Sequence, residues 1–286
     1  DNFPSRAMSD LQTYPAPAKL NLFLHVVGRR QDGYHLLQSV FRFLDYADSL
    51  SFRMCDDGVI KRAYALPGVP EEDDLCVQAA KLLQRTAGTR LGVEISLDKK
   101  LPLGGGLGGG SSDAATTLMA LNRLWKLGFT REKLQHLGLQ LGADVPVFVF
   151  GQNAFAEGVG EVLQPISLPP AWYVVLVPKV NISTEEIFAD PQLTRNTNRI
   201  KITAFSTEQV HNDLEPVVCR KYPQVAQHLA WLNQFGAARM TGSGACVFAE
   251  YATEREVREV LAQLPGQMSG FAARGLDRHP MYDSVL

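Results

Sequence analysis

The chain has 286 residues, of which 45% are hydrophobic and 20% charged, and its formal net charge is −2 at pH 7. These proportions are typical of a water-soluble globular protein with one large or two ordinary domains. The near-neutral charge argues against a nucleic-acid or anionic-membrane partner, and no apolar run reaches the ~18 residues of a membrane span. We therefore expect a cytoplasmic protein without a nucleic-acid or membrane partner.

Two features of the ends and of the cysteines bear on this expectation. Residues 1–7 precede Met8 and are interpreted as a non-native extension, which we leave out of the fold reasoning. The four cysteines are widely spaced, show no metal-binding pattern and are expected to be reduced, small core residues. They are Cys55, Cys76, Cys219 and Cys246.

The first regular pattern is a strict alternation of apolar residues at 18–26, which predicts a strand with one face in the core. Lys19, Asn21 and His25 then share the opposite face. A solvated face is the usual explanation of such residues, but Lys19 and Asn21 also present a cation and an amide in one direction. His25 is interpreted as structural.

The next elements follow from turn and periodicity signals. The Asp-Gly-Tyr-His segment at 32–35 predicts a turn, and apolar segments at 37–44 and 49–54 predict two further strands. An acidic run at 71–74 precedes a helical pattern at 75–83. Acidic residues fit the first turn of a helix because they interact favourably with its dipole.

A glycine-rich segment at 101–113 is the most informative stretch of the chain, with six glycines in seven positions followed by Ser-Ser-Asp. It lies between an alternating strand pattern at 91–97 and a helical pattern at 114–125. Glycines let a backbone approach a ligand closely, and free N–H groups at a helix start favour an anion. We therefore predict a phosphate-binding loop in which a side chain at Gly106 would occupy the phosphate's place. A residue of 111–113 is expected to cap the helix.

Three alternatives to this loop fit the glycines less well. A P-loop needs Gly-Lys-Ser/Thr, and no lysine follows these glycines. Gly104, Gly106 and Gly109 satisfy the dinucleotide pattern, but a second helical segment at 130–141 follows where that fold needs a strand. A flexible linker is the remaining alternative, although linkers lack tight apolar flanks.

The composition changes in the middle of the chain. Asp144 stands before an apolar run and, taken alone, is best explained as a helix cap two residues before Pro146. A hairpin is expected at 156–161, and a cluster of prolines then places a domain boundary around 155–170.

The second half alternates strands with helices, which predicts an α+β sandwich. A second glycine turn at 240–244 is either another backbone cradle or merely a tight turn. The expected strands are 172–177, 245–250 and 270–275, and the expected helices are 184–188, 217–233 and 254–264.

Three separated segments resemble the three motifs of the GHMP kinases, a family that includes galactokinase, homoserine kinase and mevalonate kinase. They are Pro-Ala-Lys-Leu-Asn-Leu at 17–22, the glycine segment with Asp-Ala-Ala at 102–115, and Thr-Gly-Ser-Gly-Ala at 241–245. The segments at 32–35 and 142–148 resemble the subgroup that phosphorylates a diphosphocytidyl sugar alcohol in the non-mevalonate route to isoprenoids. The resemblance covers nearly the whole chain.

The resemblance implies an α+β, two-domain GHMP kinase fold. Its N-terminal domain, placed at 8–160, would be ribosomal-S5-like, and its C-terminal domain, placed at 161–286, would be ferredoxin-like. It also implies ATP and Mg²⁺ as cofactors, with Ser112 as a candidate Mg²⁺ ligand. ATP would be bound by the glycine segment, namely Pro102, Leu103, Gly104, Gly105, Gly106, Leu107, Gly108, Gly109, Gly110, Ser111 and Ser112.

Two residues match the family's catalytic pair. Asp144 would accept the proton of the attacking hydroxyl, and Lys19 would stabilise the carboxylate and the developing charge. Asp74 stands where an asparagine is expected near the adenine. Because a carboxylate has no NH₂ donor, that contact must differ or pass through water.

Tyr34, His35 and Phe188 match the family's cytidine pocket, and Asn21 matches a substrate-side residue. We expect the cytosine to lie between the rings of Tyr34 and Phe188, with His35 contacting its polar edge. The partner would be a cytidine diphosphate sugar alcohol with a free tertiary hydroxyl, which is converted to its 2-phosphate. The expected assembly is a monomer or weak dimer.

Two rival functions follow from the same residues. One is a sibling kinase of another small alcohol, against which the Asp-Gly-Tyr-His segment argues. The other is a ligand sensor that keeps the fold without turnover, against which the presence of both Lys19 and Asp144 argues.

Overall fold

The structure, a computed structural model, describes residues 12–205 and 210–284, so the extension predicted at 1–7 lies outside the described residues. The strands are β1 Thr13–Arg29, β2 His35–Cys55, β3 Ile60–Arg62, β4 Gly92–Asp98, β5 Ala154–Glu157, β6 Val162–Pro165, β7 Trp172–Leu176, β8 Ala238–Met240, β9 Val247–Tyr251 and β10 Gly270–Leu276. The α-helices are α1 Leu75–Ala87, α2 Gly109–Leu124, α3 Arg131–Leu139, α4 Val145–Phe150, α5 Thr184–Ala189, α6 Glu215–Lys221, α7 Pro223–Leu232 and α8 Glu254–Leu261.

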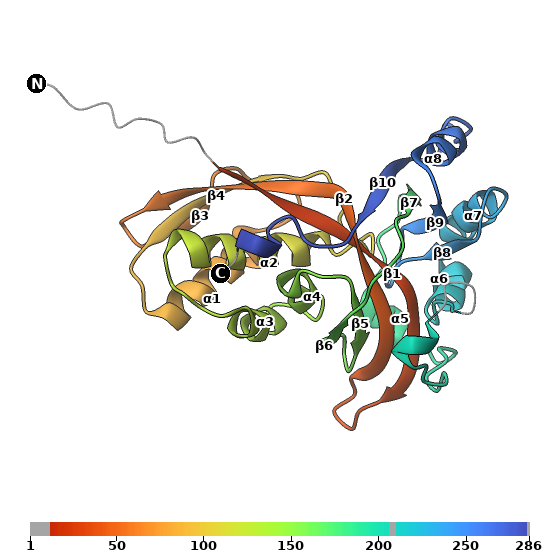
Figure 1. Cartoon of the computed structure of the whole chain (residues 1–286), viewed down its shortest axis with the longest axis horizontal. Helices are drawn as coiled ribbons and strands as arrows, with labels where there is room; N and C mark the ends of the chain where they lie inside the picture. The colour runs from red at the N-terminus through yellow and green to blue at the C-terminus, as the bar shows by residue number, and fades with distance from the viewer. Residues whose placement is uncertain (1–11, 206–209, 285–286) are drawn as a thin grey trace, which may run out of the picture.

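The long antiparallel pair β1 and β2 connects two lobes, one with α1–α4 and one with α5–α8 (Figure 1). The strands predicted at 37–44 and 49–54 are a single strand, β2, which pairs with β1, β4, β5 and β10. The polar residues between them do not turn the chain. Asp48 is fully buried, and its carboxylate accepts hydrogen bonds from Lys99 Nζ and from the backbone N–H of Lys100 and Leu101.

The first lobe packs α1–α4 against the sheet around β2 and β4 (Figure 1). Helix α2 is its centre, because every residue from Ser112 to Asn122 is buried, not only the predicted apolar stripe. The predicted helix at 75–83 is α1, but the acids before it form a separate 3₁₀ turn at Glu71–Asp73. The hairpin expected at 156–161 is the antiparallel pair β5 and β6. The domain boundary proposed at residue 160 falls in the turn between them.

The second lobe has the ferredoxin-like order expected for it. Its antiparallel strands lie in the order β10-β7-β9-β8, and the chain runs β7, helices, β8, β9, α8, β10. The single helix predicted at 217–233 is wrong, because it is interrupted at Tyr222 (φ −127°, ψ 84°) between α6 and α7. Pro223 causes this break, since the residue before a proline is disfavoured in the α conformation.

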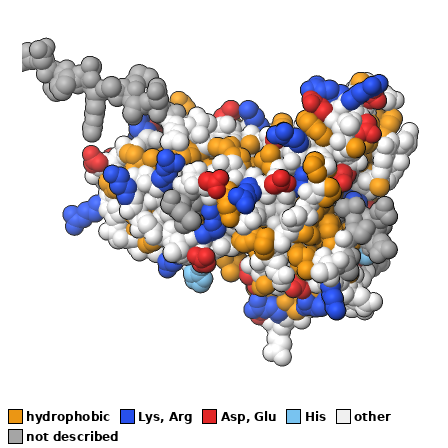
Figure 2. All heavy atoms as spheres, in the orientation of Figure 1, with side chains coloured by type: hydrophobic (Ala, Val, Ile, Leu, Met, Phe, Trp, Pro, Cys, Tyr) orange, Lys and Arg blue, Asp and Glu red, His pale blue; other side chains and the backbone are white. Residues whose placement is uncertain are grey.

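The surface and the cysteines agree with most of the compositional expectations. Charged side chains of both signs are interspersed over the face in Figure 2, and hydrophobic side chains gather around the middle of the view. None of the helices in the described part of the chain is both long and apolar enough to cross a membrane. All four cysteines are free; Cys76 and Cys246 are buried, whereas Cys55 and Cys219 are only partly buried.

Candidate functional site

Lys19 on β1 lies at the centre of the site. Its Nζ is 3.1 Å from Asp144 Oδ2 and donates to Asn21 Oδ1 and to the carbonyl of Gly106 at 3.0 Å. An ammonium has three protons, so these three acceptors use its full donor capacity. The solvated-face interpretation is wrong for Lys19 and Asn21, which are only 2% and 4% exposed, whereas the burial of His25 (3% exposed) agrees with its structural interpretation. The other lobe and the glycine segment cover this face of the strand.

Asp144 is placed directly before α4 and faces Lys19. It occupies the N-cap position, but its side chain accepts no hydrogen bond from the helix backbone. The cap interpretation is therefore wrong for the side chain, whose carboxylate pairs with Lys19 instead. Lys19 is almost fully buried, whereas the Asp144 side chain is 36% exposed, so the carboxylate is the accessible member of the pair.

The second glycine turn joins the other two motifs. The hydroxyl of Thr241 accepts a hydrogen bond from the Asn21 N–H at 2.9 Å and donates to the Gly106 carbonyl at 3.3 Å. Gly106 has φ +76°, and a Cβ built on it would lie 2.3 Å from the Thr241 carbonyl oxygen. The expectation that a phosphate lies where this side chain would be is therefore wrong, because backbone of the second lobe occupies that place. Asn212 holds the turn through hydrogen bonds from Nδ2 to the carbonyls of Met240 and Gly242.

The glycine segment is half packed and half open. A Cβ at Gly105 would lie 2.8 Å from Cys246 Sγ, and one at Gly108 would lie 3.0 Å from Lys19 Cε. Gly104 has φ +68°, and the nearest atom to a Cβ built on it would be Asn181 Oδ1, 3.9 Å away. Leu103 and Gly104 are exposed, Pro102, Gly106, Gly108 and Gly110 are partly buried, and Gly105, Leu107 and Gly109 are buried. The open part is the stretch around Gly104.

Helix α2 begins earlier than expected and has no side-chain cap. Its N-cap is Gly108, so residues 111–113, predicted as caps, already lie within the helix. Ser112 is fully buried, and its hydroxyl donates to the Pro17 carbonyl at 2.7 Å. The structure therefore does not place Ser112 where it could ligate Mg²⁺, whereas Ser111 lines the cavity described below.

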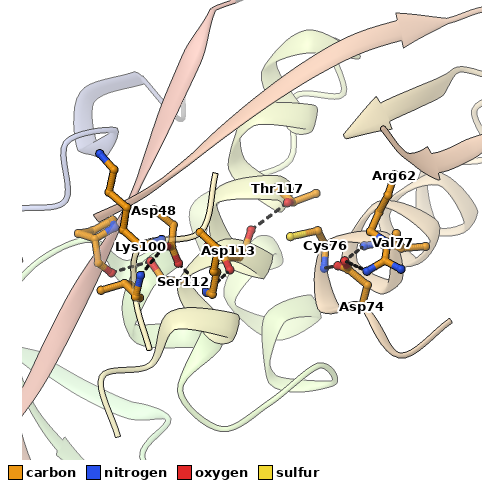
Figure 3. A network of polar contacts seen from close by, with 12 residues as sticks. Asp48, Arg62, Asp74, Cys76, Val77, Lys100, Ser112, Asp113 and Thr117 are labelled. Atoms are coloured by element: carbon orange, nitrogen blue, oxygen red, sulfur yellow. Dashed lines mark hydrogen bonds and ion pairs between the residues drawn. The ribbon is translucent and has the colours of Figure 1, made fainter. Parts of the chain in front are cut away.

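A buried ionic cluster supports the start of α2 (Figure 3). Lys99 Nζ donates to Asp48 Oδ2 at 2.5 Å and to Asp113 Oδ2 at 2.7 Å. Burial, together with the negative charge of Asp48, raises the pKa of Asp113 to about 7 although Lys99 opposes this. One cation between two carboxylates thus fixes the segment that leads into the glycine loop. The only sign of this cluster in the sequence was the position of Lys99 just before the glycines.

Asp74 has a structural environment. Its Oδ1 caps α1 by accepting from the N–H of Cys76 and Val77, and its Oδ2 pairs with Arg62 at 3.2 Å (Figure 3). It is also almost fully buried. These contacts use both carboxylate oxygens, so a direct contact of Asp74 with adenine remains only a prediction.

A cavity of about 810 Å³ joins the predicted catalytic and substrate-side residues, but only two of the residues predicted for ATP. It runs from the Lys19–Asp144 pair to the turn between β1 and β2, and it also receives side chains from α5. Its lining includes Lys19, Asn21, Arg29, Tyr34, His35, Ser39, Gly106, Ser111, Asp144, Glu185 and Phe188. Asp74, Ser112 and the remaining predicted glycines do not line it.

The far end of the cavity is aromatic. The rings of His35 and Phe188 have centroids 4.9 Å apart with an interplanar angle of 32°. Tyr34 is 64% exposed, and its ring lies 6.0 Å from the guanidinium of Arg30. Phe188 therefore contacts His35 directly, and a base held between Tyr34 and Phe188 stays a prediction. Arg195, for which the sequence carried no signal, donates to His35 Nε2 at 3.0 Å.

The described residues contain no cluster of three or more acidic, histidine or cysteine side chains able to hold a metal ion. Mg²⁺ in phosphoryl-transfer sites is usually held by one or two carboxylates together with phosphates and waters, so such a cluster is not required. The cavity offers the Asp144 carboxylate and the Ser111 hydroxyl as oxygen donors.

Comparisons with known proteins agree with this geometry. Residues 74–152 match the model for the GHMP kinases N terminal domain, and residues 198–270 match that for GHMP kinases C terminal. The chain is 66% identical to the 4-diphosphocytidyl-2-C-methyl-D-erythritol kinases of Nitrosospira multiformis (94% of this chain, 92% of the relative) and Thiobacillus denitrificans (96% and 99%). A crystal structure of 4-(cytidine 5'-diphospho)-2C-methyl-D-erythritol kinase superposes with a TM-score of 0.81 at 32% identity, covering 92% of this chain and 99% of that one.

Proposed function

Because the chain belongs to the GHMP kinase family, we propose that it transfers a phosphoryl group from ATP to the 2-hydroxyl of 4-diphosphocytidyl-2-C-methyl-D-erythritol. The observation that carries this proposal is the placement of the Lys19–Asp144 pair in the same cavity as Tyr34, His35 and Phe188. A base held at the aromatic end would leave the sugar alcohol of the same molecule pointing toward the carboxylate.

Asp144 is the proposed general base. Its carboxylate is partly exposed to the cavity, so a hydroxyl can reach it, and general-base catalysis needs that contact at hydrogen-bond distance. The Lys19 ammonium contacts Asn21 and Gly106 as well as Asp144, so these contacts fix its position. A fixed cation beside the reacting oxygens stabilises the negative charge that develops in the transition state.

The glycine segment fits the phosphates of ATP, which supplies the phosphoryl group when bound. Gly104 has open space where a Cβ would stand, and the uncapped N-terminus of α2 presents backbone N–H groups. Both features favour an anion. We assign Gly104 and the N–H groups around Gly108 to phosphate binding, and Ser111 rather than Ser112 to the Mg²⁺ side of the site.

Tyr34 and Phe188 are proposed to hold the cytosine, with His35 at its polar edge. Stacking on aromatic rings tolerates every base, so the choice of cytosine must come from hydrogen bonds. We further propose that the enzyme acts in the cytoplasm as a monomer or weak dimer, with its domains divided near residue 160.

The proposal is tested by measuring ADP release with ATP, Mg²⁺ and a panel of alcohols. We expect turnover with 4-diphosphocytidyl-2-C-methyl-D-erythritol and a product that ³¹P NMR identifies as the 2-phosphate. Mevalonate, homoserine and galactose serve as controls. Preference for one of these would favour a sibling kinase, and binding of the cytidine substrate without ADP release would favour a sensor.

A further inference from the structure

Arg195 joins the two residues proposed to contact the cytosine. Its Nε donates to His35 Nε2 at 3.0 Å, and its Nη2 donates to the Phe188 carbonyl at 2.8 Å. The same guanidinium also donates to the carbonyls of Leu193 and Asp190. One side chain thus connects the first residue of β2 with the end of α5.

The contact with His35 determines which ring nitrogen carries the proton. A guanidinium only donates hydrogen bonds, so His35 Nε2 must be the acceptor. A neutral imidazole then carries its proton on Nδ1. Among the residues that the structure describes, none is a hydrogen-bond partner of Nδ1, and the ring lines the cavity. His35 therefore presents an N–H donor for a ligand.

A fixed donor distinguishes cytosine from uracil. Cytosine has an acceptor at N3, whereas uracil has an N–H donor there, and two donors that face each other in a buried site are strongly disfavoured. We infer that Arg195 is a positioning residue for base selection, because it fixes His35 as the donor that accepts cytosine and rejects uracil. This inference rests on the proposed function only for the identity of the base.

The charges around His35 support the neutral form. Burial, and then the positive charges of Arg195 and Arg29, hold the pKa of His35 below its ordinary value. Asp32, Glu185 and Asp144 are the acidic groups that line the same cavity. Loss of Arg195 removes one of the causes that lower this pKa, so the pKa should rise and protonation should begin at a higher pH.

The test measures binding of cytidine diphosphate and uridine diphosphate by calorimetry, which does not depend on turnover. In the wild-type enzyme we expect a clear preference for the cytidine nucleotide. Arg195→Met should reduce that preference about tenfold or more. Arg199→Met is the matched control, because Arg199 is an exposed arginine that pairs with Glu157 and does not line the cavity.

Steady-state kinetics then separate positioning from a structural role. With 4-diphosphocytidyl-2-C-methyl-D-erythritol, Arg195→Met should raise KM about tenfold and leave kcat within about threefold, since the Lys19–Asp144 pair is untouched. Arg195→Lys, which keeps one charged donor, should restore part of the preference.

Two results would overturn the inference without bearing on the reaction. One is ¹⁵N NMR of the wild-type protein that places the His35 proton on Nε2. The other is a double variant His35→Ala/Arg195→Met whose loss of preference equals the sum of the single losses, because residues that act through one another are not additive. A preference for the cytidine nucleotide without any turnover would instead contradict the proposed function and still support the role of Arg195.

Discussion

Replacing Gly106 by alanine should destabilise the contact between the lobes, whereas the same change at Gly104 should not. Both glycines have positive φ, +76° and +68°, so alanine is strained at either position. A Cβ at Gly106 would lie 2.3 Å from the Thr241 carbonyl oxygen and 3.1 Å from that of Gly244. At Gly104 the nearest atom, Asn181 Oδ1, is 3.9 Å away. The difference between the two variants therefore isolates the collision.

The size of this difference follows from two contributions to the free energy of unfolding. The left-handed conformation costs an alanine about 1–2 kcal/mol at both positions. The collision adds about 1–3 kcal/mol at Gly106 alone, as overpacking usually does. Because 1 kcal/mol corresponds to about 2–4 °C in a protein of this size, Gly106→Ala should melt about 2–12 °C below Gly104→Ala.

Calorimetry of the two variants side by side measures this difference directly. Gly106→Ala should also lower kcat, since its carbonyl accepts a hydrogen bond from Lys19 at 3.0 Å. Gly104→Ala should act mainly on the KM for ATP, because its open space is where we place a phosphate. Equal melting temperatures of the two variants would refute the packing argument. If Gly106→Ala instead melts like wild type but binds ATP more weakly, the phosphate lies at Gly106 as the sequence predicted.

Three further predictions concern single side chains. Asp144→Asn should lower kcat by about 10²–10⁴-fold while calorimetry still detects both substrates; near wild-type turnover would exclude Asp144 as the base. Burial and the charge of Asp48 raise the pKa of Asp113 from 3.8 to about 7, so the stability from its bound proton is present at low pH and is lost as the pH rises through about 7. The melting temperature of Asp113→Asn, measured relative to wild type, should therefore rise between pH 5 and pH 8. The control Asp98→Asn, at the exposed end of β4, should show no such rise. A difference between Asp113→Asn and wild type that does not change with pH would contradict this prediction. Phe188→Ala should weaken cytidine and uridine nucleotides alike by about 10–100-fold, as loss of stacking does. Early melting with normal nucleotide binding would instead make Phe188 a packing residue.

Local patterns predicted most elements because they depend on nearby residues. The apolar periods at 75–83 and 130–141 gave α1 and α3, and the alternation at 91–97 gave β4. One error was local, since Pro223 breaks the helix predicted at 217–233, and another came from contacts far apart in the chain. The polar residues inside β2 divided it into two predicted strands, but the carboxylate of the buried Asp48 accepts hydrogen bonds from residues 99–101, about fifty positions later.

The resemblance predicted Lys19 with Asp144 as a catalytic pair, and Tyr34, His35 and Phe188 as one pocket, but the spacing of these residues in the sequence did not show their geometry. The motifs identified Lys19 and Asp144, but only the tertiary structure places them 3.1 Å apart. Arg195 could not have been found, since it lies in an irregular segment without a motif and contacts His35, which is 160 positions earlier in the chain. Ser111 and Ser112 could not be distinguished either, because the start of α2 at Gly109 decides which hydroxyl faces the cavity.

The number of glycines in the loop has two physical causes, not one. A phosphate cradle alone explains an open position such as Gly104. Gly105 and Gly106 are instead required by the second lobe, whose Cys246 and Thr241 approach closer than any side chain would permit. The loop is thus a binding surface on one side and a lobe contact on the other. Because the backbone of one segment serves both, a change in how the lobes pack must move the loop that we assign to ATP.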